Sequence, residues 1–298
     1  MEKRKFGKTE LEVTVLGFGG AEIGNERAEQ EQVTLLLNEA LDAGLNVIDT
    51  AAAYLASEEM IGKAVSHRRK EFNLFTKCGA LDGFSRYDWS KNGILETIQT
   101  SLRRLKTDYL DLVQLHSCDV EELKRGEAVE GLQRAVERGY TRYMGYSGDD
   151  QPARFAVEMN VFDTLQTSVN IADQQSIEFT IPLAREREMG VIAKRPIANA
   201  VWKHDEKPEN GYFHTYWDRI QKLQYDFLKN PLPESIGTAL RFTLSVPGVH
   251  TAIVGTKKPG RWQENAEQVR DAALSAEEFE SIRNRWFETA DESWTGQI

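Results

Sequence analysis

The stretch LETIQTSLRRLKTDYLDLVQLH, residues 95–116, contains two hydrophobic patterns in succession. Its first half repeats apolar residues at the three- and four-residue spacing of an amphipathic helix, at Leu95, Ile98, Leu102 and Leu105. After the polar break KTD, residues 110–116 form a short apolar run of the length that predicts a buried strand. A helix of this length next to a buried strand is typical of an α/β protein.

The same unit is repeated along the whole chain. Eight short apolar or β-branched runs, each followed by a helical pattern, cover residues 13–16, 46–49, 72–77, 110–116, 141–146, 164–169, 191–194 and 251–254. Eight such units in 298 residues match a closed barrel of parallel strands. We therefore expect an α/β fold, a (β/α)8 TIM barrel that forms one domain over residues 1–298. An open doubly wound sheet is the alternative.

Two segments fall outside the repeat. Residues 4–12 have the pattern of a short hairpin, which we expect to plug the N-terminal end of the barrel. Residues 198–232 form an insertion after the seventh predicted strand and are rich in aromatic side chains. Loops that follow the strands lie at the C-terminal face of a barrel, where active sites are found. This insertion therefore either walls a pocket or packs as an extra helix on the rim.

Composition excludes several classes of protein. With 37 Lys+Arg against 47 Asp+Glu, the net charge is −10, which argues against a nucleic-acid partner. The charged N-terminal residues predict no signal peptide, and no stretch approaches the ~18 apolar residues of a membrane span. We therefore expect a cytoplasmic protein with no membrane contact. Cys78 and Cys118 lack the spacing of a metal site, so we expect reduced thiols and no metal.

Ionisable side chains stand at the ends of the second, third and fourth predicted strands. They are Asp49, Lys77 and His116, and Tyr54 follows Asp49 by five residues. Charged groups at the ends of buried strands are costly unless they meet one another. Because neighbouring strands of a barrel end side by side, we predict that these four side chains converge on one small volume.

Such a group has the chemistry of a carbonyl reductase. An adjacent ammonium favours phenolate, so we expect Lys77 to lower the pKa of Tyr54, with Asp49 holding the cation in place. His116 then orients a substrate oxygen or helps to pass the proton. Hydride arrives at the carbonyl carbon while Tyr54 protonates the oxygen. Taken singly, each residue also has an ordinary structural interpretation.

A basic loop follows the eighth predicted strand. Residues 255–262 read GTKKPGRW, and a helical pattern begins just beyond them. A helix N-terminus next to cationic side chains can bind an anion. The glycine motif of a Rossmann fold is missing, since Glu22 stands where its third glycine is required. The polar side chains of the loop are Thr256, Lys257, Lys258 and Arg261.

Five stretches resemble the aldo-keto reductase superfamily. They are LGFGG at 16–20, NVIDTAAAYLASEEMIGKAV at 46–65, FTKCG at 75–79, SLRRLKTDYLDLVQLH at 101–116 and MGYSG at 144–148. The resemblance covers nearly the whole chain and implies a (β/α)8 barrel, a small carbonyl substrate and NADPH as the cofactor. It places the family's catalytic roles on Asp49, Tyr54, Lys77 and His116.

The resemblance also implies a set of cofactor contacts. Arg261, Glu264 and Asn265 match the residues that bind the adenosine 2′-phosphate and adenine, which favours NADPH over NADH. The nicotinamide carboxamide is expected near Ser147 and Gln166. The full set of expected cofactor-binding residues is Gly20, Asp49, Ser147, Gln166, Lys194, Thr256, Arg261, Glu264 and Asn265.

Three positions depart from the family pattern. Gly148 replaces the Asn of the usual Ser-Asn pair, Lys194 replaces the aromatic residue that commonly stacks on nicotinamide, and Gly255 replaces a frequent lysine. Lys194 either disfavours the positively charged oxidised nicotinamide or helps to bind phosphate. Two alternatives remain, a nicotinamide-binding redox sensor with little turnover and a Schiff-base lyase that uses Lys77 or Lys194. The sequence predicts neither the physiological substrate nor the oligomeric state.

Overall fold

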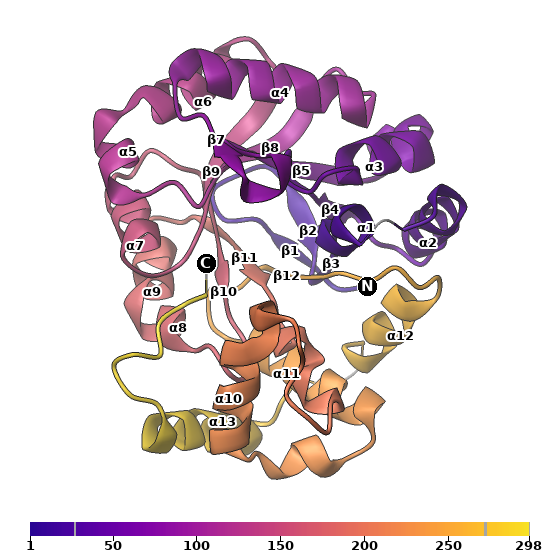
Figure 1. Ribbon diagram of the computed structural model, residues 1–298, viewed down its shortest axis with the longest axis vertical. Helices are drawn as coiled ribbons and strands as arrows, with labels where there is room; N and C mark the ends of the chain where they lie inside the picture. The colour runs from indigo at the N-terminus through magenta and orange to yellow at the C-terminus, as the bar shows by residue number, and fades with distance from the viewer. Residues whose placement is uncertain (27, 271–272, 298) are drawn as a thin grey trace.

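Eight parallel strands form a closed barrel in the computed structural model, which describes residues 1–26, 28–270 and 273–297 (Figure 1). Around the barrel the strands follow one another in chain order, and the last pairs with the first. They are β3 (Leu16–Gly19), β4 (Val47–Asp49), β5 (Asn73–Cys78), β8 (Leu110–His116), β9 (Thr141–Ser147), β10 (Thr164–Ser168), β11 (Gly190–Lys194) and β12 (Thr251–Val254). The predicted (β/α)8 barrel is confirmed, and the open sheet is excluded.

Helices surround the barrel (Figure 1), and the apolar faces of most of them pack on it. The N-terminal half contributes α1 (Ala21–Asn25), α2 (Gln30–Asp42), α3 (Ser57–Val65), α4 (Lys91–Leu105), α5 (Val120–Arg125) and α6 (Glu127–Glu137). The C-terminal half contributes α7 (Asp150–Glu158), α8 (Gln175–Phe179), α9 (Ile181–Glu186), α10 (His214–Leu223), α11 (Leu232–Ser245), α12 (Arg261–Gln268) and α13 (Ala276–Thr289). None of the helices in the described residues is long and apolar enough to cross a membrane.

Helix α4 shows how the sequence sets these elements. Its N-cap is Ser90, whose hydroxyl accepts a hydrogen bond from the Gly93 amide at 3.1 Å, and it ends where Lys106 adopts a left-handed conformation. Its buried face includes Ile94 and Ile98. Each such side chain contributes roughly 1.5–3 kcal/mol when it is fully buried. The amphipathic spacing therefore determines which face meets the barrel.

The first predicted strand, residues 13–16, is wrong in its boundaries. The barrel strand β3 begins only at Leu16, and β2 (Glu12–Thr14) instead pairs with β1 (Lys3–Lys5) in an antiparallel hairpin. One apolar run thus serves two elements. Apolar residues of this N-terminal hairpin, Phe6, Leu11 and Val13, pack against barrel residues Val47, Phe75, Leu112, Ile192 and Ile253. The hairpin therefore plugs the barrel, as predicted.

The aromatic insertion after β11 packs mainly as extra structure on the rim. It forms η3 (Ala198–Lys203), η4 (Gly211–Phe213), α10 and η5 (Asp226–Lys229) before α11 begins. Tyr216 and Tyr225 are buried in a second apolar cluster that also contains Trp286 and Trp294. Tyr212 differs, because its side chain is 53% exposed and its hydroxyl accepts a hydrogen bond from Arg195. Through Arg195, this part of the insertion bears on the site described below.

Candidate active site

Three adjacent barrel strands bring the predicted catalytic side chains together. Strands β4, β5 and β8 lie side by side. Strand β4 ends at Asp49, β5 ends one residue after Lys77, and β8 ends at His116. Tyr54 follows β4 in a turn in which its amide donates to the Ala51 carbonyl at 3.0 Å. We call Asp49, Tyr54, Lys77 and His116 the tetrad.

Contacts within the tetrad are close. The Lys77 ammonium forms an ion pair with Asp49 and donates to the Thr50 carbonyl at 2.9 Å. Lys77 Nζ lies 4.9 Å from the centroid of the Tyr54 ring, and the Tyr54 and His116 rings are 5.5 Å apart at a steep angle. The predicted convergence is therefore present in the structure.

Two glutamines hold the second oxygen of Asp49. Gln166 Nε2 donates to Asp49 Oδ2 at 3.0 Å, and Gln114 Nε2 lies 3.4 Å from the same oxygen. Ser147 Oγ in turn donates to Gln166 Oε1 at 3.2 Å. The predicted pair Ser147 and Gln166 is therefore joined to the tetrad, and Gln114 is a member that the sequence analysis missed. Gln114 precedes His116 by two residues on the same strand, so their side chains point to the same face, and this spacing could have identified it.

The protonation states of the tetrad follow from burial and charge. Burial alone would lower the pKa of Lys77, but the Asp49 carboxylate and the Tyr54 phenol hold that pKa above its ordinary value. Burial raises the pKa of Tyr54 and outweighs the opposing Lys77 charge. Lys77 does lower the pKa of Tyr54, as expected, but burial raises it by more, so the net shift is upward and not downward as expected. Tyr54 is a protonated phenol at neutral pH.

His116 is a neutral imidazole. Burial and the positive charges of Lys77, Lys194 and Arg195 together place its pKa well below the ordinary value. Its Nδ1 atom is buried and has no hydrogen-bond partner among the described residues. A neutral ring can donate one hydrogen bond and accept another, so His116 is suited to orient a polar ligand.

A strained loop covers one side of the tetrad. The Phe84 ring lies 4.8 Å from the His116 ring and 6.3 Å from the Tyr54 ring. Phe84 adopts a φ of 66°, a conformation that side chains other than glycine rarely take. Its position could not be predicted from the sequence, because it depends on this local conformation. Phe84 supplies an apolar wall next to the imidazole.

Lys194 is paired with a carboxylate that the sequence analysis did not single out. Its Nζ lies 2.8 Å from Asp149 Oδ2, and Asp149 Oδ1 also accepts hydrogen bonds from Thr167 Oγ1 at 2.8 Å and the Ser168 amide at 2.6 Å. Burial lowers the pKa of Lys194 despite this carboxylate. Lys194 is therefore a held cation at the end of β11 rather than a freely mobile one.

There is a steric reason for glycine at position 148, where the family usually has Asn. A Cβ atom at this position would lie 2.7 Å from the hydroxyl of Tyr146. That hydroxyl donates to the Cys118 carbonyl at 2.6 Å, so the tyrosine is fixed in place. The space of the missing side chain is thus occupied by Tyr146.

The basic loop after β12 lies next to the end of β3. A Cβ on Gly255 would lie 3.1 Å from the Gly19 carbonyl and 3.4 Å from Glu22 Oε1, so a lysine there would be crowded. Lys257 is paired with Glu26 at 2.6 Å, and Arg261 with Glu264 at 3.0 Å. Each of these two cations therefore already has an acidic partner.

The remaining expected cofactor residues lie in suitable surroundings. Helix α12 begins after Gly260 with no side-chain cap on its first turn, which leaves amide donors for an anion. Asn265 is buried on this helix, and the Thr256 hydroxyl accepts a hydrogen bond from the Lys258 amide at 3.1 Å. At Gly20 a Cβ would lie 2.7 Å from Ser57 Oγ, so the backbone there is packed closely. Together with the unpartnered His116 Nδ1, these features fit a dinucleotide between the tetrad and α12.

Neither cysteine lies in surroundings that favour a reactive thiolate. Cys78 and Cys118 are both buried as free thiols. Burial raises the pKa of each thiol above its ordinary value, and a protonated thiol is a poor nucleophile. The prediction of reduced thiols agrees with this environment.

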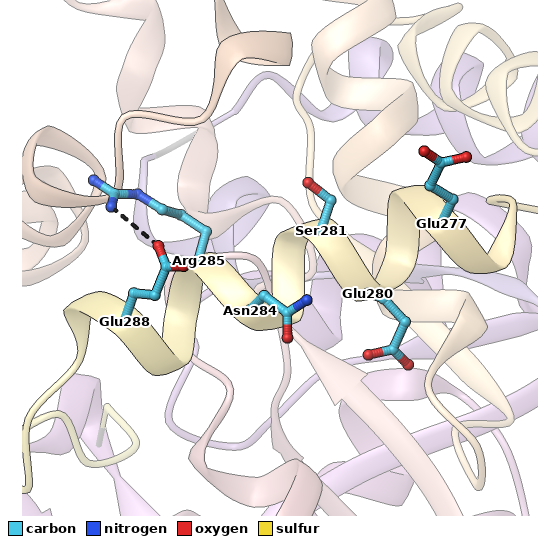
Figure 2. Close-up of a pocket in the computed structure, with 6 residues that line it drawn as sticks. All are labelled: Glu277, Glu280, Ser281, Asn284, Arg285 and Glu288. Carbon is cyan, nitrogen blue, oxygen red and sulfur yellow. Dashed lines mark ion pairs between the residues drawn. The ribbon is translucent and has the colours of Figure 1, made fainter.

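A surface hollow lies along α13 (Figure 2). Its lining residues are Glu277, Glu280, Ser281, Asn284, Arg285 and Glu288. In Figure 2 their side chains project from a single helix, and Arg285 lies 3.6 Å from Glu288. This hollow is a solvated acidic helix face and contains none of the predicted site residues.

Comparison with known proteins identifies the family. The Aldo/keto reductase family model matches residues 15–286. The chain belongs to this family. The chain is 29% identical to the "Uncharacterized oxidoreductase YqkF" of Bacillus subtilis, covering 95% of the chain and 96% of the relative. It is 24% identical to the "L-galactose dehydrogenase" of Arabidopsis thaliana, covering 91% and 89%.

A solved structure supports the same assignment. The holo form of "aldo-keto reductase AKR11C1 from Bacillus halodurans" aligns with a TM-score of 0.84 and 28% identity, covering 99% of each chain. The chain is therefore an oxidoreductase of the aldo-keto reductase family, built on a (β/α)8 barrel. This aldo-keto reductase has its tetrad at the C-terminal face of the barrel.

Proposed function

We propose that this aldo-keto reductase is an NADPH-dependent oxidoreductase that reduces an aldehyde or ketone to an alcohol, with Tyr54 as the general acid. One observation carries the proposal. The Lys77 ammonium is bound to Asp49 and at the same time lies 4.9 Å from the centroid of the Tyr54 ring. A buried cation beside a buried phenol stabilises negative charge that develops on the phenol oxygen.

The reaction divides between cofactor and protein. When bound, a reduced nicotinamide cofactor would supply hydride for the carbonyl carbon. Tyr54 donates its phenolic proton to the carbonyl oxygen, and Lys77 stabilises the phenolate that remains. Aldehyde, hydride and proton together give the alcohol, and solvent returns a proton to Tyr54. Neutral His116 donates a hydrogen bond that orients the carbonyl oxygen.

Burial raises the pKa of Tyr54, which keeps the phenol protonated at neutral pH but makes it a weaker acid. The proposed role therefore depends on the Lys77 charge, which opposes this shift and stabilises the phenolate as it forms. Asp49 acts as a positioning residue, because it holds Lys77 beside the phenol without reaching the substrate. Phe84 supplies the apolar wall against which a carbonyl substrate packs.

The preference for NADPH rests on the loop after β12. Arg261 is 38% exposed and its partner Glu264 is 62% exposed. Exposed pairs of this kind contribute only about 0.2–1 kcal/mol, so a 2′-phosphate can replace the carboxylate. Asn265 and Thr256 line the same loop and helix. We place the nicotinamide end near Ser147, Gln166 and Lys194, with Gly20 and Asp49 beside it.

The two alternatives make different demands. A Schiff-base lyase needs a neutral amine, whereas the raised pKa of Lys77 keeps this amine protonated. Burial lowers the pKa of Lys194, but its amine is held in an ion pair by Asp149 at 2.8 Å. A redox sensor with little turnover has the same binding site, so only a rate measurement separates it from a reductase.

The experiment uses wild-type protein, NADPH carrying deuterium at the transferable position, and a panel of neutral aldehydes that includes benzaldehyde. We expect loss of nicotinamide absorbance and an alcohol that carries deuterium on its carbinol carbon. Tight NADPH binding without turnover across the panel would favour the sensor. A substrate adduct trapped by borohydride in the absence of NADPH would favour the lyase.

A further inference from the structure

The cations that act on the tetrad outnumber the carboxylates paired with them. Lys77 is paired with Asp49. Lys194 and Arg195 share one carboxylate, Asp149, at 2.8 Å and 3.7 Å. Three cations against two carboxylates leave one positive charge in excess among these residues. Buried unpaired charge is costly, so the excess points to an anionic ligand.

The next acidic residue along the chain does not remove this excess. Asp173 has its own cationic neighbour, Arg219, at 4.0 Å, and it accepts a hydrogen bond from Tyr216 at 2.8 Å. Burial also raises the pKa of Asp173 to about 7, so it is only partly ionised at neutral pH. The charge of Arg195 is therefore not balanced by this carboxylate.

Arg195 is held in a defined orientation. Its Nε donates to the Tyr212 hydroxyl at 2.9 Å, and its Nη1 donates to Ser168 Oγ at 2.9 Å and to the Gln297 carbonyl at 2.7 Å. No hydrogen bond within residues 1–26, 28–270 and 273–297 uses its Nη2 group. The side chain is only 14% exposed. A fixed guanidinium with an unused donor group is suited to bind a carboxylate or similar oxyanion.

Strand β10 relates Arg195 to the tetrad. Gln166 contacts Asp49, and Ser168, two residues further on, contacts Arg195. Residues two apart on a strand point to the same side and are separated by about 7 Å. The Arg195 charge also acts on the pKa of both Tyr54 and His116. Arg195 therefore contacts β10 two residues beyond the Gln166–Asp49 contact, on the side of the strand's C-terminal end.

We propose that the carbonyl substrate of this enzyme carries a carboxylate or similar oxyanion, and that Arg195 binds this group through Nη2. The inference rests on the proposed reductase function and names its substrate class. Tyr212 assists by holding the guanidinium in place through Nε. A neutral carbonyl compound can still bind at the tetrad, but it leaves the excess positive charge at Arg195 unpaired.

The test compares two aldehydes that differ in charge, 4-carboxybenzaldehyde and its neutral methyl ester. A second pair, 3-carboxybenzaldehyde and its methyl ester, changes the distance between the aldehyde and the carboxylate. The enzymes are wild type, Arg195→Met, Arg195→Lys, and the control Arg125→Met. Arg125 lies on α5, is 64% exposed and pairs with Glu122 at 2.6 Å. NADPH affinity is measured for every variant by fluorescence titration, which also shows that each variant is folded.

We expect wild type to prefer at least one acid over its ester by about tenfold or more in kcat/KM, because charged hydrogen bonds are the strong ones. Arg195→Met should lower kcat/KM for the acid about 10- to 100-fold and for the ester less than about threefold. Arg195→Lys should retain part of the preference, and Arg125→Met all of it.

Three outcomes overturn the inference. One is an acid-to-ester ratio that is the same in wild type and Arg195→Met. Another is a large loss of NADPH affinity in Arg195→Met with equal losses for acid and ester, which would assign Arg195 to the cofactor phosphates. A third is a wild-type enzyme that reduces the esters but not the acids. If wild type reduces neither aldehyde type, the proposed reductase function itself fails.

Discussion

Replacing Lys77 by Met tests the buried ion pair on which the site depends. Lys77 and Asp49 are 0% and 1% exposed, so the change leaves a carboxylate buried without its cation. Removing one partner of such a pair typically costs about 3–5 kcal/mol. Gln166 still donates to Asp49, and this bond contributes about 0.5–1.5 kcal/mol or more, since its acceptor is charged. We therefore expect a loss of about 3 kcal/mol in the free energy of unfolding at neutral pH.

The pH dependence of that loss has a definite sign. Burial raises the pKa of Asp49, and Lys77 is the largest opposing influence. Without Lys77 the folded-state pKa rises further above the unfolded value of ~3.9. The folded state then binds more protons than the unfolded state, so its stability falls as the pH rises through this window. The deficit of Lys77→Met should be smaller at pH 5 than at pH 8.

Urea unfolding followed by tryptophan fluorescence measures these differences. The control is Lys124→Met, which breaks an exposed pair with Glu121 at 2.9 Å and should change stability by less than about 1 kcal/mol. Adding Asp49→Asn to Lys77→Met removes the unpaired charge and should restore part of the loss. Equal stability of Lys77→Met and wild type at pH 8 would refute the reasoning, as would a double variant no more stable than the single one.

Three further predictions concern the cofactor, the glycine at 148 and the pH profile. Arg261→Ala should weaken NADPH binding at least tenfold more than NADH binding in fluorescence titrations; equal weakening would remove Arg261 from the 2′-phosphate. Gly148→Ala should lower the free energy of unfolding by about 1–3 kcal/mol, because its Cβ meets Tyr146; an unchanged urea midpoint would contradict this. Burial raises the pKa of Tyr54 and lowers that of His116, so kcat/KM for reduction should vary less than about threefold between pH 7 and 9. A fall in kcat/KM centred below pH 8 would show that the effect of Lys77 on the pKa of Tyr54 outweighs that of burial.

Three members of the tetrad could be predicted because their positions depend on strand topology, whereas Tyr54 lies in the turn after β4. Asp49, Lys77 and His116 stand at or near the ends of three strands that are adjacent in any closed barrel of this order. The apolar runs revealed those strands directly. The first strand was misplaced, because one run of apolar residues, 13–16, belongs partly to the hairpin and partly to β3.

Features that depend on loop conformation could not be predicted. Phe84 and Arg195 both have positive φ, 66° and 55°, without being glycine, so nothing in their residue type indicates this conformation. The pairing of Asp149 with Lys194 joins two segments far apart in sequence. The sign of the Tyr54 shift was wrong because burial, which the sequence does not measure, outweighs the neighbouring charge.

A single-turnover comparison of wild type and Tyr54→Phe tests the central claim most directly. Each protein is loaded with NADPH and mixed with benzaldehyde in a stopped-flow instrument, and Tyr87→Phe, at an exposed tyrosine, serves as the control. We predict that Tyr54→Phe binds NADPH as tightly as wild type but loses nicotinamide absorbance about 10²- to 10⁴-fold more slowly. Wild-type rates in Tyr54→Phe would contradict the assignment of Tyr54 as the proton donor.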